Sequence, residues 1–159
     1  MNNHWTEVET LALEKVVKFE EMVPVGVCVL ERMRKIGGNI VMICGPMTTG
    51  GRGSLTANME YFKKTQAFAS FRGLFIFDQT PFEGTMQRLS EGHRHRKQYC
   101  VEILHIFYRQ IFSRRLIDEL MFLPDWASST GASWERQEGT DLGLKISDYP
   151  REWLPFIED

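Results

Sequence analysis

The chain has 159 residues, of which 43% are hydrophobic and 25% charged, as is typical of a single globular domain with a buried core. The net charge of −2 and a pI near 6.1 argue against a nucleic-acid-binding protein, which would carry excess positive charge. No apolar run approaches the roughly 20 residues of a membrane-spanning helix, and the first residues lack a signal-peptide pattern. An odd number of cysteines, three, without metal or disulfide spacing predicts reduced thiols and a cytoplasmic protein.

The N-terminal segment predicts two helices outside the main domain. Thr6 and Glu9 match a capping box and precede an apolar stripe that continues to Val23. Pro24 is expected to end this helix and to begin a second one, over residues 25–35. We expect these helices to form an extension that does not belong to the catalytic layer.

Strands and helices alternate in the rest of the chain. Short apolar runs predict strands at 39–44, 74–77, 116–123 and 144–146, and helices are expected at 55–71, 92–114 and 132–142. The stretch that follows Pro81 is expected to be irregular. Such alternation predicts a parallel sheet with helices on both faces, and we expect a flavodoxin-like α/β fold of about four or five strands. The chain is thus divided into a helical extension (1–38), an α/β domain (39–147) and a C-terminal tail (148–159), which is expected to be pinned to the surface.

Two loops rich in glycine and serine follow the first and third predicted strands. The loop at 45–53 contains four glycines and Arg52, and the loop at 125–131 contains consecutive serines, Ser128 and Ser129. In the flavodoxin-like strand order the first and third strands are neighbours, and ligands bind outside their carboxyl ends. The two loops are therefore expected to face each other across one crevice.

Several residues of these loops are candidates for a ligand site. Arg52 can pair with an anion, although the loop around it can also be a plain strand-to-helix turn. Ser128 and Ser129 either cap the next helix or bind a phosphate. Trp126 either stacks on a base or packs against the fold. Glu135 is expected in the first turn of the next helix, where the helix dipole would hold it ionised as a nucleophile requires; a stabilising carboxylate is the alternative.

The sequence gives no reason to expect a metal ion or another cofactor. His93 and His95 flank an arginine in a basic stretch, but no carboxylate stands at metal-ligand spacing, so a solvated surface is the favoured interpretation.

Three segments resemble the nucleoside 2-deoxyribosyltransferase-like superfamily. They are ICGPMTTGG at 43–51, the Asn58-x-x-x-Phe62 pair, and LPDWASSTGASWE at 123–135. The resemblance covers about residues 39–147 and is nearest to a branch of small proteins related to the 2′-deoxynucleoside 5′-phosphate N-hydrolases. It implies a flavodoxin-like fold and hydrolysis or transfer at the N-glycosidic bond of a (deoxy)nucleotide, with no nucleic acid or membrane as partner.

The resemblance also implies residue roles. Glu135 would attack C1′ of the sugar and form a glycosyl-enzyme. Ser129, six residues earlier, would help to hold the 5′-phosphate. The 2′-deoxynucleoside 5′-phosphate N-hydrolases carry a serine at this position, whereas relatives that act on free deoxynucleosides carry an aspartate. With the two loops included, the remaining candidate binding residues are Gly45, Pro46, Met47, Thr48, Gly50, Gly51, Arg52, Asn58, Trp126, Ser128, Gly131 and Ala132.

Two positions depart from the superfamily's pattern. A tyrosine common in the first strand corresponds to Met42, and the aspartate that assists the leaving base corresponds to Gln110, which cannot act as a general acid. Either Asp78 or Asp125 takes over this role, or the protein binds a nucleotide or an ADP-ribose-like ligand without cleaving it.

The helix expected over 92–114 predicts an assembly. Its apolar residues, among them Leu104 and Ile106, surround more than one face, and its own sheet can cover only one. The N-terminal helices or a second subunit must cover the other. We predict a homodimer, with the N-terminal helices or the long helix at a symmetric contact.

Overall fold

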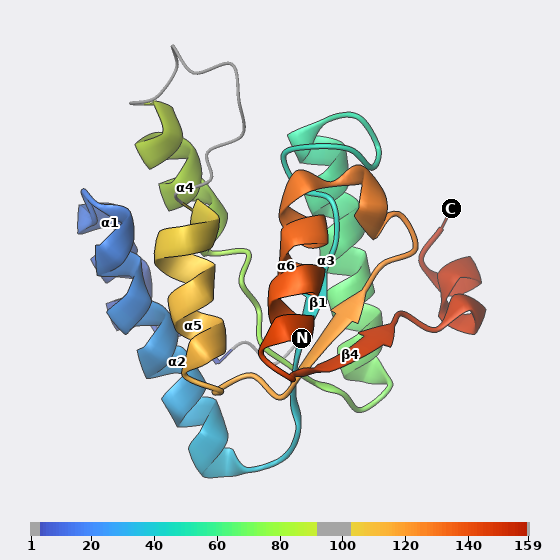
Figure 1. The fold of residues 1–159 in the computed structure, drawn as a ribbon, viewed down its shortest axis with the longest axis horizontal. Helices are drawn as coiled ribbons and strands as arrows, with labels where there is room; N and C mark the ends of the chain where they lie inside the picture. Colours follow the sequence, from blue (N-terminus) through green and yellow to red (C-terminus); the bar gives the residue numbers. More distant parts are fainter. Residues whose placement is uncertain (1–3, 92–102, 159) are drawn as a thin grey trace.

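The computed structural model describes residues 4–91 and 103–158 and is built around a four-stranded parallel sheet (Figure 1). Its strands are β1 (Ile40–Cys44), β2 (Phe75–Ile76), β3 (Glu119–Phe122) and β4 (Lys145–Asp148), in the order β2-β1-β3-β4. Val41 lies opposite Ile76 on one side and Glu119 on the other. Both central strands are buried throughout, as parallel strands covered by helices on both faces must be. The predicted flavodoxin-like α/β architecture is confirmed.

Six α-helices and several shorter helical turns surround the sheet in the described residues. The α-helices are α1 (Glu7–Lys15), α2 (Met22–Ile36), α3 (Leu55–Phe71), α4 (Phe82–Ser90), α5 (Arg109–Ser113) and α6 (Thr130–Asp141). A π-helical segment, Ile103–Tyr108, runs into α5, and a 3₁₀ segment, Arg151–Phe156, follows β4. Helix α3 has the predicted bounds because Ser54 caps it, accepting a hydrogen bond from the Ala57 N–H at 3.2 Å. The first part of the helix predicted at 92–114 lies outside the described residues.

Other helix boundaries differ from the predictions. Helix α1 ends at Lys15 rather than Val23, and Pro24 lies in the first turn of α2, where a missing N–H leaves no helical bond unmade. The stretch after Pro81, expected to be irregular, is α4; the buried residues Phe82 and Met86, four positions apart, form its inner face.

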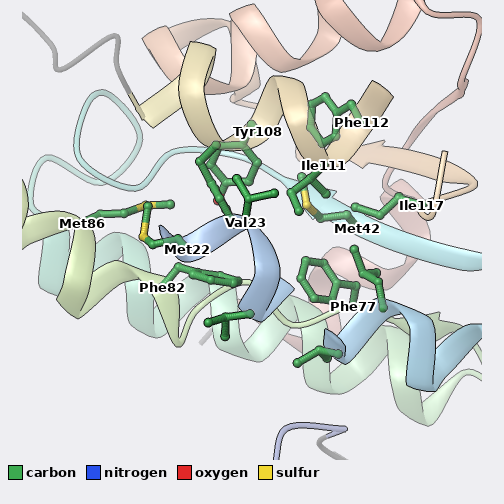
Figure 2. Packing of buried hydrophobic residues seen from close by; sticks show 14 of the residues in the cluster. Met22, Val23, Met42, Phe77, Phe82, Met86, Tyr108, Ile111, Phe112 and Ile117 are labelled. Atoms are coloured by element: carbon green, nitrogen blue, oxygen red, sulfur yellow. The ribbon is translucent and has the colours of Figure 1, made fainter. Parts of the chain in front are cut away.

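The two faces of the sheet have separate hydrophobic cores. Ile40, Met42 and Cys44 of β1 face a cluster formed by α1, α2, α4, α5 and the π-helical segment, whereas Val41 and Ile43 face α3 and the C-terminal segment. Figure 2 shows the first cluster, in which Met42 and Ile111 lie among side chains from several helices. Alternate strand residues thus supply both cores.

Helix α2 is a structural layer of the domain, which corrects the expectation that residues 1–38 stand apart from it. Its Val29, Leu30 and Met33 are fully buried in the first cluster. At Gly26 a Cβ atom would lie 3.1 Å from Ile111 Cδ1, so α2 and α5 are packed closely. Figure 1 shows α2 beside α5, with α1 packed on α2. In the described part of the predicted long helix, α5 is therefore covered by α2 of the same chain.

The C-terminal tail is pinned to the domain, as predicted. The Tyr149 hydroxyl donates a hydrogen bond to the Thr65 carbonyl at 3.0 Å, and Ile157 is buried. Phe68 of α3 stacks on Phe156, with ring centroids 5.3 Å apart. No helix within residues 4–91 and 103–158 is both long and apolar enough to cross a membrane.

Candidate active site

A cavity of about 250 Å³ opens at the carboxyl ends of β1 and β3, the position expected for the crevice. It is lined by Gly45, Met47, Thr48, Thr49, Phe62, Gln79, Glu83, Met86, Gln87, Ser90, Tyr108, Ser129, Gly131, Ala132 and Glu135. Its volume of about 250 Å³ lies slightly below the roughly 300–1,000 Å³ usual for ligand pockets, so it suits one small ligand.

The two loops predicted to face each other are joined by hydrogen bonds. The Gly51 N–H donates to Ser128 Oγ at 2.9 Å, and the Thr130 N–H donates to Thr49 Oγ1 at 3.0 Å. Gly50 has φ of 68°, and a Cβ atom there would lie 2.1 Å from the Ser128 carbonyl oxygen, so only glycine is accommodated. Ser128 and the loop glycines Gly50 and Gly51 thus shape the rim and do not line the cavity.

The side chain of Asn58, in α3, fixes the conformation of the loop at 45–53 by three hydrogen bonds. Its Nδ2 donates to the Met47 carbonyl at 2.8 Å and the Gly50 carbonyl at 3.2 Å, and its Oδ1 accepts from the Arg52 N–H at 2.7 Å. Pro46 is buried and packs against Gly51, where a Cβ atom would lie 2.6 Å from Pro46 Cβ. Neither Asn58 nor Pro46 lines the cavity, so both support the ligand site indirectly.

Glu135 lines the cavity, but its environment differs from the expectation. Because Ser129 caps α6 by accepting a hydrogen bond from the Ala132 N–H at 3.2 Å, the helix starts at Thr130 and Glu135 is its sixth residue, beyond the first turn. The side chain is 8% exposed. Burial is the main reason that the pKa of Glu135 is raised to about 8; a hydrogen bond from the Cys44 thiol opposes the shift and the charge of Glu83 adds to it. Glu135 thus lies outside the first turn, where the helix dipole was expected to hold its carboxylate ionised, and burial shifts its pKa in the opposite direction.

Glu83 is a second carboxyl in the same cavity, and the sequence reading missed it. It is the second residue of α4, and burial raises its pKa to about 7. The signal was present: Glu83, Gln87 and Ser90 recur at helical spacing beside the apolar pair Phe82 and Met86, and all three line the cavity. This spacing places the three side chains on one face only if residues 82–90 form a helix, and the stretch after Pro81 was expected to be irregular.

The two aspartates considered as acids do not line the cavity. Asp78 Oδ1 accepts hydrogen bonds from the Thr80 N–H at 3.0 Å, the Thr80 hydroxyl at 2.7 Å and Gln66 Nε2 at 3.2 Å. These contacts shape the turn after β2. Asp125 Oδ1 is buried and finds no hydrogen-bond partner within the described parts of the chain.

Arg52 and Trp126 point to other parts of the surface. The Arg52 guanidinium lies 3.8 Å from the centre of the Tyr61 ring and 3.9 Å from Glu158 Oε1. Trp126 packs edge-on against Phe122, and the guanidinium of Arg136 lies 4.6 Å from the Trp126 ring. Among the described residues, no Lys, Arg or His lines the cavity. The predicted binding residues that do line it are Gly45, Met47 and Thr48 of the first loop, and Ser129, Gly131 and Ala132 at the start of α6.

The positions that depart from the superfamily's pattern are also outside the cavity. Met42 is buried under the sheet, and Gln110 is exposed, whereas Tyr108, two residues earlier, reaches the cavity. Residues 4–91 and 103–158 contain no group of three or more His, Cys, Asp or Glu side chains that could hold a metal ion, and His93 and His95 lie outside the described residues.

The cavity therefore combines the buried carboxyl of Glu135, the half-buried carboxyl of Glu83, a helix start with its serine cap, and a largely apolar wall, all at the carboxyl edge of the sheet. Comparison of the chain with protein-family models, with curated proteins and with solved structures found no match.

Proposed function

We propose that the protein acts on the N-glycosidic bond of a (deoxy)nucleoside or its 5′-monophosphate, with Glu135 as the nucleophile. The observation that carries the proposal is the position of the Glu135 carboxyl, buried in a cavity between the carboxyl ends of β1 and β3. The segment 123–135 that delivers it is also the one that most resembles the nucleoside 2-deoxyribosyltransferase-like superfamily. A cavity of about 250 Å³ favours a single nucleoside unit over a ligand of ADP-ribose size.

Glu135 would act in its ionised form. Its carboxylate attacks C1′, the C1′–N bond breaks with its electron pair on the base, and water or a second base releases the sugar from Glu135. The sugar develops positive charge in the transition state. A buried carboxylate attracts this charge far more strongly than a carboxylate in water would, because the dielectric constant inside the cavity is low. The same burial that raises the pKa of Glu135 in the ligand-free protein therefore strengthens its interaction with the transition state.

A panel of nucleosides and nucleoside monophosphates tests the proposal. We expect a free base to appear, measured by chromatography, with at least one (deoxy)nucleoside or monophosphate. The second candidate function, a non-catalytic nucleotide-binding module, is favoured by the exposed Gln110 and by the burial that raises the pKa of Glu135. A ligand that raises the melting temperature without being consumed would select this second function.

Ser129→Asp is expected to weaken the preference of the protein for a nucleoside monophosphate over the free nucleoside. Aspartate caps a helix as well as serine does, so it can accept the Ala132 N–H hydrogen bond and preserve α6. Its negative charge would lie at the cavity wall and repel a 5′-phosphate. We expect the affinity ratio of monophosphate to nucleoside to fall at least about tenfold, which corresponds to about 1.4 kcal/mol.

Titration calorimetry of both ligands measures this ratio, with Ser54→Asp as the matched cap substitution at α3, away from the cavity. An unchanged ratio in Ser129→Asp would show that Ser129 does not meet a phosphate.

A homodimer remains our proposal for the assembly, although the long helix no longer requires one. A symmetric contact would use the exposed aromatic side chains of Phe71 and Phe156, which flank Phe68. Sedimentation equilibrium at micromolar concentration distinguishes twice the chain mass of 18.5 kDa from a monomer. We expect Phe71→Arg to shift a dimer towards the monomer; a wild-type chain that sediments as a monomer would refute it.

A further inference from the structure

Glu83 and Glu135 reach one cavity from different helices. Glu135 comes from α6, which follows β3, and Glu83 comes from α4, which follows β2. The two carboxyls are close enough for the charge of Glu83 to raise the pKa of Glu135. Since the part of the cavity wall that the structure describes contains no Lys, Arg or His, no cation there offsets two negative charges.

The position of Glu83 is set by firm packing at the start of α4. The preceding residue, Phe82, is fully buried, and its ring lies 4.5 Å from that of Phe107 and 5.0 Å from that of Trp5. Trp5 Nε1 also donates a hydrogen bond to the Asp78 carbonyl at 2.7 Å, which ties the N-terminal segment to the turn before α4. The N-terminal segment before α1 thereby helps to hold Glu83 at the cavity.

Two carboxylates that share a desolvated cavity repel each other, so a state in which one of the two carboxyls keeps its proton is favoured. Burial raises the pKa of both carboxyls, to about 8 for Glu135 and about 7 for Glu83. Near neutral pH the pair can therefore hold a single proton, which the ligand-free protein keeps mainly on Glu135, the carboxyl with the higher pKa. The reaction requires this proton on Glu83, so it has to move between the two carboxyls when the substrate binds. One protonated and one ionised carboxyl is the combination that glycosidic bond cleavage uses, because the leaving group needs a proton and C1′ needs a nucleophile.

We propose that Glu83 is the residue that protonates the departing base, an inference that rests on the proposed function. In the first step Glu135 forms an ester bond with C1′, the C1′–N bond breaks, and the proton of Glu83 passes to the base. In the second step ionised Glu83 takes a proton from water, the resulting hydroxide attacks C1′, and the Glu135 carboxylate is released. Glu83 thus fills the role for which Gln110 is chemically unsuited and which Asp78 and Asp125, outside the cavity lining, do not reach.

Leaving-group chemistry tests this role. The two probes are 2′-deoxyguanosine 5′-monophosphate and its N7-methylated form, whose base already carries a positive charge and leaves without being protonated. In Glu83→Gln we expect kcat/KM for the first probe to fall about 10²–10⁴-fold, the usual contribution of general acid catalysis, and that for the methylated probe to fall less than about tenfold. Glu135→Gln should lose activity on both probes.

Glu138→Gln is the matched control, because it also removes a carboxyl, lies one turn after Glu135, and does not line the cavity. Its partner is Arg109, at 2.9 Å, and both probes should be cleaved at the wild-type rate. If Glu83→Gln slows both probes equally, or neither, Glu83 is not the proton donor, and the proposed function stands. If the wild-type protein releases base from neither probe, the present inference fails, and the wider substrate panel then decides the proposed function separately.

A second readout does not need catalysis. In Glu83→Gln the like charge near Glu135 is gone, so the carbon-13 shift of the Glu135 carboxyl should titrate at a lower pH than in the wild type. An unchanged titration in a variant with wild-type circular dichroism would contradict the shared proton. Glu83→Asp, which keeps the acid on a shorter side chain, should recover part of the rate lost in Glu83→Gln.

Discussion

Glu135→Gln is expected to lower base release by about 10⁴-fold or more while the chain remains folded, because the nucleophile is lost. Glutamine has nearly the same volume and can still accept the hydrogen bond from the Cys44 thiol. The measurement is single-turnover release of base from the best substrate of the panel, with circular dichroism as the check on folding.

The matched control for this loss is again Glu138→Gln, which should retain full activity. Wild-type turnover in Glu135→Gln would show that Glu135 is not the nucleophile, whatever the role of Glu83. A loss of only about tenfold would point to a binding role instead of a covalent one.

The free energy of unfolding is expected to fall as the pH rises from about 5 to about 9. The folded protein holds protons on Glu135 and Glu83, with pKa values raised to about 8 and about 7, whereas the unfolded chain releases them near 4.5. The stability linked to these groups is therefore fully present below the unfolded value and is lost as the pH rises through the folded values. At about 1.36 kcal/mol per pKa unit, Glu135 alone sets an upper limit of about 5 kcal/mol.

Glu9 acts in the opposite direction and in a different pH range. Burial disfavours its charge, but hydrogen bonds from Thr6 and Arg32 outweigh this and lower the pKa of Glu9 to about 2. Its contribution is present above about pH 4.5 and is lost only as the pH falls towards 2, below the range in which the cavity pair titrates. His4, whose pKa is lowered by burial and by Arg32, adds stability as the pH rises through its own titration and so opposes the decline.

Urea unfolding at a series of pH values measures the effect. Glu135→Gln should flatten the decline and be more stable than the wild type above pH 8, whereas Glu138→Gln should decline like the wild type. A wild-type protein equally stable at pH 5 and pH 9 would mean that the cavity carboxyls are ionised in the folded state.

The sequence by itself determined the architecture around the site. Local patterns sufficed for this: Ser54 caps α3 as predicted, and the apolar runs at 39–44 and 116–123 become the two central strands. Once the strand order followed from the alternation of strands and helices, the facing of the two loops followed too. Glu135, Ser129 and part of the first loop were therefore found at the cavity where they were expected.

Only the tertiary structure decided which ionisable side chains reach the cavity and how strongly burial shifts their pKa values. Whether Glu135 is ionised depends on how many atoms exclude water from it, and those atoms come from strands and helices far apart in the chain. Arg52, adjacent in sequence to the predicted anion site, turns instead to Tyr61 and Glu158. Glu83 joins the cavity because the N-terminal residue Trp5 and the distant Phe107 pack around Phe82. Periodicity and spacing describe neighbours within one element, whereas desolvation and charge pairing are set by contacts between elements.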